Sequence, residues 1–141
     1  MKKFCCALLV AGLLLLSGCF SSNTTPSKEE ARQNALECLE THRGEMETIL
    51  NSGKAVGETK WCLSYSKLGD GRYEFDLYRE GFTGTNIVTG ILYLPNDTPD
   101  SDYRQDEENP NAYSFARGVT DKFYLERLEK NWFFFYYEYD F

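Results

Sequence analysis

The last ten residues of the chain constrain its fold more than any other segment. Residues 132–141 read W-F-F-F-Y-Y-E-Y-D-F, so a β-strand here would carry apolar side chains on both of its faces. Such a strand needs cover above and below, which predicts either an inner strand of a sheet or an edge strand buried by a partner. Nearly all other aromatic residues also lie after Trp61, and aromatics make up 16% of the chain. This composition favours β-structure over a helical bundle.

Segments of alternating apolar and polar residues predict further antiparallel strands upstream. Residues 59–66 and 73–77 alternate on either side of Gly69-Asp70-Gly71, which is typical of a hairpin. Residues 120–129 are ambiguous between a strand and a short helix, and a strand is favoured because the next residues can turn directly into the last segment. The predicted strands are 59–66, 73–77, 87–94, 113–117, 120–129 and 132–141.

A helix is predicted ahead of these strands. Ser27 and Glu30 form the S-x-x-E pattern of a capping box, and Asn51-Ser52-Gly53 ends the segment. Between them one stripe recurs at spacings of three and four residues: Ala31, Ala35, Cys38, Leu39, His42, Met46, Ile49 and Leu50. The predicted fold class is therefore α+β, with one N-terminal amphipathic helix packed on a curled antiparallel sheet of about five or six strands. Residues 28–141 are expected to form this single domain.

The N-terminus carries a targeting signal. Lys2 and Lys3 precede an apolar run over residues 4–16, which is shorter than the roughly 20 residues that span a bilayer. The run ends in Leu16-Ser17-Gly18-Cys19, which resembles the lipobox of bacterial lipoproteins. That resemblance implies that residues 1–18 are a signal peptide cut before Cys19 and that Cys19 carries diacylglycerol and a further fatty acid such as palmitate. A plain secreted protein or an uncleaved anchor are the alternatives.

Residues 19–27 are predicted to form the lipidated cysteine and a flexible tether, because they are polar and lack periodicity. Phe20, rather than Asp, follows Cys19, and in the lipoprotein family this implies the outer membrane if the host is Gram-negative. The chain is thus expected to lie in the cell envelope, outside the cytoplasm. A helix followed by a curled sheet also resembles the broad shape of cystatin-like and NTF2-like lipoprotein domains, which mostly bind, but no site residues carry over from them.

The charge of the chain restricts its partners. The formal net charge is −7, whereas a nucleic-acid partner requires a basic surface. The same charge argues against direct electrostatic adhesion to anionic lipid, so the lipid on Cys19 would supply the attachment. An acidic surface instead favours a basic protein partner.

Cys38 and Cys62 are the only cysteines left after cleavage and lipidation, and such a pair in an exported domain predicts a disulfide. The alternative uses the same residues for chemistry. Cys38 and His42 are one helical turn apart, and with Cys62 they offer three soft ligands for zinc or a thiol with its base. No C-x-x-C or H-x-x-H pattern supports this alternative, so no metal or cofactor is predicted.

Two sets of residues are candidates for contact with a partner. Residues 96–111 form a long acidic segment that lacks the glycine of a calcium loop, and a solvated, mobile loop is expected there. Tyrosine tips in the last strand are suited to a half-wet surface. The candidates are Asp97, Asp100, Asp102, Asp106, Glu107, Glu108, Tyr136, Tyr137 and Tyr139. Glu74 and Asp76 are instead expected on a solvated strand face.

These observations predict a membrane-anchored envelope lipoprotein that acts as a non-catalytic binding module. A sharper form of the prediction is an inhibitor or immunity-type protein for a basic partner such as a lysozyme or a secreted toxin. The alternative is a metal-dependent or thiol enzyme that uses Cys38, His42 and Cys62. The oligomeric state is left open.

Overall fold

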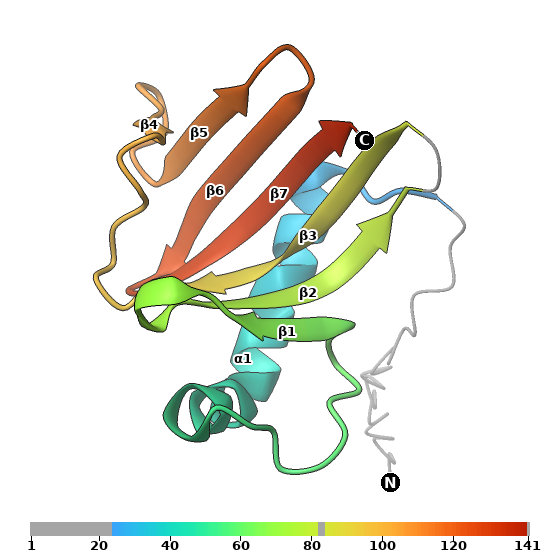
Figure 1. The fold of residues 1–141 in the computed structure, drawn as a ribbon, viewed down its shortest axis with the longest axis vertical. Helices are drawn as coiled ribbons and strands as arrows, with labels where there is room; N and C mark the ends of the chain where they lie inside the picture. Colours follow the sequence, from blue (N-terminus) through green and yellow to red (C-terminus); the bar gives the residue numbers. More distant parts are fainter. Residues whose placement is uncertain (1–23, 82–83, 141) are drawn as a thin grey trace, which may run out of the picture.

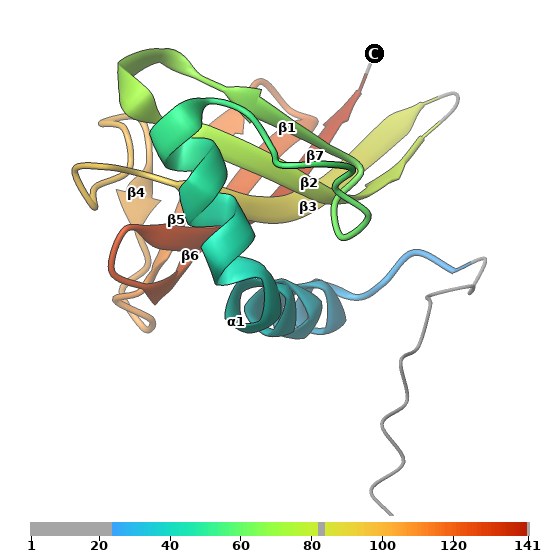
Figure 2. The same cartoon turned by 90° about the horizontal axis from the view of Figure 1, so that it is seen from below.

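The computed structural model describes residues 24–81 and 84–140 of the chain. Helix α1 (Lys28–Ser52) packs on one face of a seven-stranded sheet, and every strand pair in the sheet is antiparallel (Figures 1 and 2). The strands follow the order β1-β2-β3-β7-β6-β5-β4, and a short 3-10 turn, η1 (Gly69–Gly71), connects the first two. Their bounds are β1 Ser64–Lys67, β2 Tyr73–Glu80, β3 Thr85–Tyr93, β4 Arg104–Gln105, β5 Ala112–Arg117, β6 Asp121–Glu129 and β7 Trp132–Asp140.

The sheet agrees with the α+β prediction but has more strands than expected. The additional strand is β4, a two-residue strand inside the predicted acidic loop that pairs with β5. The final segment is an inner strand, because β7 lies between β3 and β6. Residues 121–129 form a strand, as favoured over a helix.

The start of the first predicted strand is wrong. Residues 59–66 alternate in sequence, yet β1 begins only at Ser64. The preceding residues turn toward the helix, where the Trp61 ring stacks on His42 with centroids 5.4 Å apart. Tyr65 lies opposite Phe75 in the pairing of β1 with β2, and Trp61 also contacts Phe75, so both rings pack on the helix-facing side.

Helix α1 begins where the sequence predicts. The Ser27 side chain accepts from Glu30 N while the Glu30 side chain accepts from Ser27 N, and Gly53 ends the helix in a left-handed conformation. The helix nevertheless differs from the expected N-terminal amphipathic helix. It lies well inside the chain, and its backbone leaves helical geometry at His42 (φ −114°, ψ 15°), where it changes direction (Figure 2). Only part of the predicted stripe is buried: Ala31, Ala35, Leu39, Met46 and Ile49.

The sheet is buried on both faces, which explains the apolar run in β7. Phe134 belongs to the cluster beneath α1, whereas Phe133 and Phe135 belong to the cluster on the opposite face. Half-buried tyrosines pack against that second cluster, among them Tyr103 from the chain before β4. All three phenylalanines have no exposed surface.

Contacts with β6 hold the helix to one side of the sheet. Arg32 Nε donates to Glu126 Oε1 at 2.6 Å, and Arg43 pairs with Glu129. The Lys28 ammonium lies 4.0 Å above the Tyr124 ring. These contacts tie α1 to β6 along its first half and past the bend, so space remains between α1 and β2 on the other side.

Within the described ranges, no helix combines the length and the apolar character that crossing a bilayer requires. The predicted signal peptide, Cys19 and the first part of the tether lie outside the described residues.

Candidate functional site

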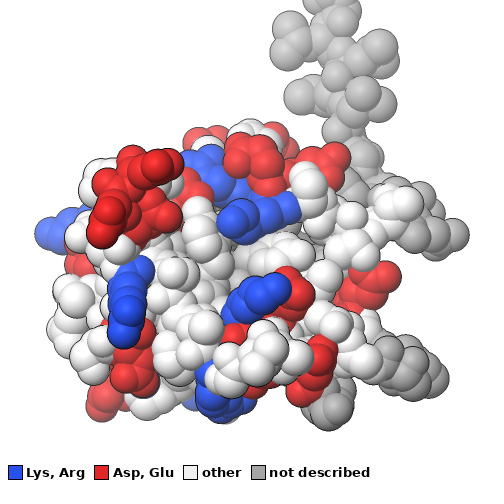
Figure 3. All heavy atoms as spheres, turned by 90° about the horizontal axis from the view of Figure 1, so that it is seen from above, with Lys and Arg blue, Asp and Glu red and all other residues white. Residues whose placement is uncertain are grey.

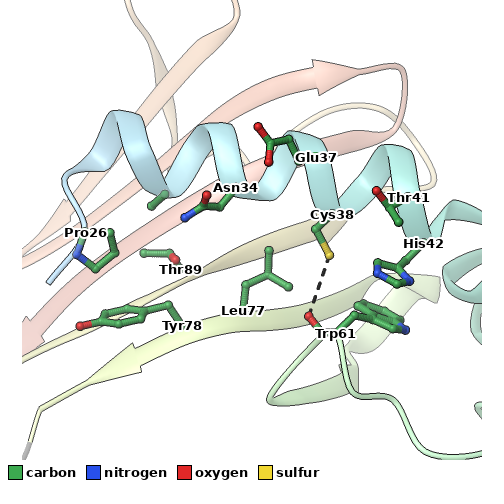
Figure 4. A pocket seen from close by; sticks show the side chains of 11 residues that line it. Pro26, Asn34, Glu37, Cys38, Thr41, His42, Trp61, Leu77, Tyr78 and Thr89 are labelled. Atoms are coloured by element: carbon green, nitrogen blue, oxygen red, sulfur yellow. Dashed lines mark hydrogen bonds between the residues drawn. The ribbon is translucent and has the colours of Figure 1, made fainter. Parts of the chain in front are cut away.

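A groove of about 550 Å³ lies between α1 and strands β2 and β3 (Figure 4). Residues of α1 form one wall at helical spacing, so the groove follows the helix axis. The opposite side is formed by β2 and β3, and Trp61 closes one end (Figure 4). The lining residues are Pro26, Ala31, Asn34, Glu37, Cys38, Thr41, His42, Trp61, Leu77, Tyr78 and Thr89. Apolar surface with a few polar groups at the rim is typical of a ligand-binding groove.

The end of the groove at Trp61 is held in a fixed arrangement. The His42 and Trp61 rings are nearly parallel, with an interplanar angle of 14°. Glu45 joins them, because its carboxylate accepts from Trp61 Nε1 at 2.8 Å and contacts His42 Nδ1 at 2.9 Å. These hydrogen bonds lower the pKa of Glu45, and the bond with His42 makes the larger contribution. An ionised carboxylate therefore stands beside two aromatic rings at the groove's end.

The Cys38 thiol lines the groove but is poorly suited to nucleophilic chemistry. Burial raises its pKa to about 12, and the nearby Cys62 and Glu45 contribute to the rise. The Cys38 Sγ faces the Trp61 carbonyl oxygen at 4.0 Å, and His42 is engaged with Glu45. A thiol that stays protonated near neutral pH lacks the thiolate that attacks a substrate or binds a metal. In the part of the chain that the structure describes, no three His, Cys, Asp or Glu side chains are grouped to hold a metal ion.

The structure does not contain the predicted disulfide: Cys38 and Cys62 are both free thiols. They lie close enough for Cys62 to influence the pKa of Cys38, so the bond stays a prediction for the oxidising compartment. We expect protein from its native membrane to carry the bridge, with a stabilisation of about 3–4 kcal/mol. Intact mass after alkylation, with and without prior reduction, measures this. Alkylation of both thiols without reduction would show that the bridge is absent.

Most residues of the acidic segment 96–111 are exposed, as expected for a solvated loop, but several of its side chains are braced by specific contacts. Asp97 accepts from Asn131 N at 2.6 Å and pairs with Arg127, which lowers its pKa. Asp100 pairs with Arg72 at 2.7 Å. Asp106 accepts from the backbone N–H groups of Glu108 and Asn109, both at 2.8 Å. Of the six candidate acids, Asp97 and Asp100 form ion pairs, whereas Asp102, Asp106, Glu107 and Glu108 are exposed with no ion pair among the described contacts.

Asp97 is expected to be the most important acid of this segment for stability. Replacing Asp97 by Ala removes an acceptor from the β6–β7 turn, so Asn131 N loses its partner and Arg127 keeps its bond to the Asp97 backbone oxygen but loses the carboxylate. We expect a loss of about 2–3 kcal/mol in the free energy of unfolding by urea. Asp102→Ala, in the same segment, is the control and should change it by less than about 0.5 kcal/mol. Equal effects of the two variants would contradict this role.

The three candidate tyrosines do not form one surface. Tyr136 packs with the helix-side cluster, whereas Tyr137 and Tyr139 pack on the opposite face of β7. Tyr137 stacks on Phe135 at 4.5 Å and burial raises its pKa well above the usual range. Alternation along the strand therefore separates residues that are adjacent in sequence.

The expectation that Glu74 and Asp76 lie on a solvated strand face is wrong, because on the face opposite the helix Asp76 is buried and Glu74 is half-buried. Asp76 is 5% exposed and its Oδ2 accepts from Ser64 Oγ at 2.7 Å and from Arg79 at 2.6 Å. Burial, together with the Asp76 charge and a hydrogen bond between the two carboxyls, raises the pKa of Glu74 to about 7. Asp76 Oδ1 is the one buried side-chain oxygen without a partner in the described residues, and a protonated Glu74 can donate to it. The side chains of Tyr103 and Tyr137 lie near enough to interact electrostatically with Glu74. Both come from distant segments of the chain, so no local sequence pattern signals the burial of Glu74.

Charged side chains on the face seen in Figure 3 are mixed in sign around a broad uncharged area, with no separate basic patch on that face. A comparison of the chain with protein-family models, curated proteins and solved structures gave no match. The groove between α1 and strands β2 and β3 is the candidate functional site of the described residues.

Proposed function

We propose that this protein is a lipid-anchored, non-catalytic binding module of the bacterial envelope, and that its groove takes part of a basic partner protein. The observation that carries the proposal is the groove of about 550 Å³ between α1 and the sheet. The Glu37 carboxylate lines the groove, and the Glu45 carboxylate contacts the His42 and Trp61 rings at its end. With a net charge of −7 on the chain, complementary potentials would speed the encounter with a cationic partner.

The position of the groove supports a role at the membrane. Pro26 lines it, seven residues after the proposed lipid on Cys19. Seven extended residues reach at most about 25 Å. A partner in the groove would therefore be held close to the bilayer. An inhibitor or immunity protein that intercepts a basic toxin or lysozyme at the cell surface is the sharper form of this proposal.

The enzyme alternative on Cys38, His42 and Cys62 has weaker support. The buried Cys38 thiol has its pKa raised to about 12, and His42 Nδ1 contacts Glu45. A thiol enzyme requires a base in contact with a thiol of lowered pKa. We therefore propose binding, not catalysis.

The experiment is site-specific photocrosslinking in intact cells. A photoreactive p-benzoylphenylalanine replaces Thr41, an exposed residue that lines the groove. The control places the same probe at Val119, which is 95% exposed in the turn between β5 and β6. We expect a discrete adduct with a basic protein from Thr41 alone, and its loss when Cys19→Ser removes the anchor. The same adducts from both positions, or none from Thr41, would overturn the proposal.

A further inference from the structure

Strand β2 has a free edge beside the groove. β1 pairs only with residues 73–76 of β2, and the last bond of that pairing runs from Leu63 N to Asp76 O at 2.7 Å. β2 continues to Glu80, past the end of β1 (Figure 1). Residues 78–80 pair with β3 on one side, Leu77 lies at an irregularity of that pairing, and none of the four pairs with another strand in the described ranges.

The place where a longer β1 would continue is vacated by the turn of the chain at Trp61. A β-bulge between Asp76 and Tyr78 bends β2 at the same point. Residues 77–80 contain no proline, so their outward N–H and C=O groups remain able to pair. An edge of this kind is a template for an added strand.

The free edge and the groove are parts of one surface. Leu77 and Tyr78 belong to the edge segment and also line the groove. Beyond them, Glu80 is held by the Tyr78 hydroxyl, which donates at 2.7 Å, and by Thr25. A strand added at this edge would present alternate side chains to the groove and to the opposite face of the sheet.

We propose that the free edge of β2 at residues 77–80 binds an extended basic segment of the partner by β-strand addition; this inference rests on the proposed function of the groove. Charge complementarity identifies the occupant. Glu37 lines the groove, Glu45 contacts the His42 and Trp61 rings at its end, and Glu80 belongs to the edge segment. The one basic residue of the segment, Arg79, is paired with Asp76 on the other face. Long basic side chains pack their alkyl stems on Tyr78 and Trp61 while their charged heads reach the carboxylates.

The test uses synthetic peptides of about ten residues with strong strand propensity. The probe alternates Lys and Val, and its charge control alternates Glu and Val. Two further peptides carry backbone N-methyl groups on all Lys or on all Val residues. Alternate residues of a strand point their N–H groups to opposite edges. N-methylation of all Lys or of all Val residues therefore blocks one edge of the peptide only, and only one of the two peptides should lose its pairing with β2. Binding is followed by NMR on the full chain in non-ionic detergent.

We expect the Lys-Val peptide to shift the amide signals of residues 77–80 and to slow their hydrogen exchange. The Glu-Val peptide and one N-methylated peptide should bind at least about tenfold more weakly, while the other N-methylated peptide retains its affinity. Glu37→Gln should weaken binding several-fold. The matched control Glu40→Gln, on an exposed helix residue that does not line the groove, should leave it unchanged.

Several outcomes would overturn the inference. Equal binding of the two N-methylated peptides, or no change in the signals of residues 77–80, would exclude strand addition. The proposed binding role of the groove would still stand if the Thr41 crosslink succeeds. Self-association that protects residues 77–80 in the absence of peptide would assign the edge to a second copy of the chain. Failure of the Thr41 crosslink with intact peptide pairing would instead count against the proposed function alone.

Discussion

Glu74→Gln is expected to stabilise the fold at about pH 8 while leaving its stability near pH 5 almost unchanged. The physical reason is the buried pair. Burial and the neighbouring Asp76 charge raise the pKa of Glu74 to about 7 from a usual value of 4.5. Above that pKa the wild-type protein holds two adjacent carboxylates, whereas the glutamine variant keeps a neutral donor beside Asp76.

The direction of the pH dependence follows from proton binding. Between the unfolded pKa of about 4.5 and the folded pKa of about 7, the native state holds a proton that the unfolded state has lost. The free energy of unfolding therefore falls as the pH rises through this window and levels off above it. After allowance for solvent screening the expected loss is about 2 kcal/mol.

Urea unfolding at a series of pH values measures this effect. The exposed Glu107→Gln changes the net charge by the same amount and is the control. The lowered pKa values of Asp97 and Asp106 act at more acidic pH, so they do not contribute in this window. A free energy of unfolding that stays level from about pH 5 to pH 8 in the wild-type protein would contradict the raised pKa of Glu74. A fall of the same size in Glu74→Gln would contradict it as well.

Gly90→Ala is expected to cost more than about 3 kcal/mol and to prevent stable folding. Gly90 pairs with Asp76 on β2 and with Phe135 on β7. A Cβ atom at Gly90 would lie 2.9 Å from the Phe135 ring and closer still to the carbonyl oxygen of Phe75. The backbone oxygen cannot move without breaking the pairing beside the β2 bulge, so the clash cannot be relieved locally.

Gly44→Ala is the matched control for the same chemical change. Gly44 lies in the interior of α1, and a Cβ there would meet no atom within 4 Å. Alanine should stabilise the helix by about 0.5–1 kcal/mol. Thermal unfolding of the two variants should therefore shift in opposite directions. A folded Gly90→Ala protein with wild-type stability would mean that β2 and β3 are not packed as described.

Local sequence patterns predicted the elements of this fold but not all of their bounds. The capping box at Ser27 and the left-handed Gly53 mark the two ends of the helix, because both act through hydrogen bonds within a few residues. The run from Trp132 to Phe135 predicted a strand covered on both faces, either inner or buried by a partner, since only such a strand buries consecutive aromatics. The alternation over residues 59–66 misled at its start, where the Trp61 ring packs on His42 instead of lying in the sheet.

By itself the sequence determined the α+β class, the helix ends, the burial of β7 on both faces and the acidic net charge, because each follows from neighbouring residues or from composition. Only the tertiary structure decided the candidate site. The groove exists because contacts with β6 hold α1 to one side of the sheet. The buried Glu74–Asp76 pair likewise depends on residues far away in the chain. Long-range packing sets the burial of a side chain, and burial is what turns an alternating carboxylate into a group with a raised pKa.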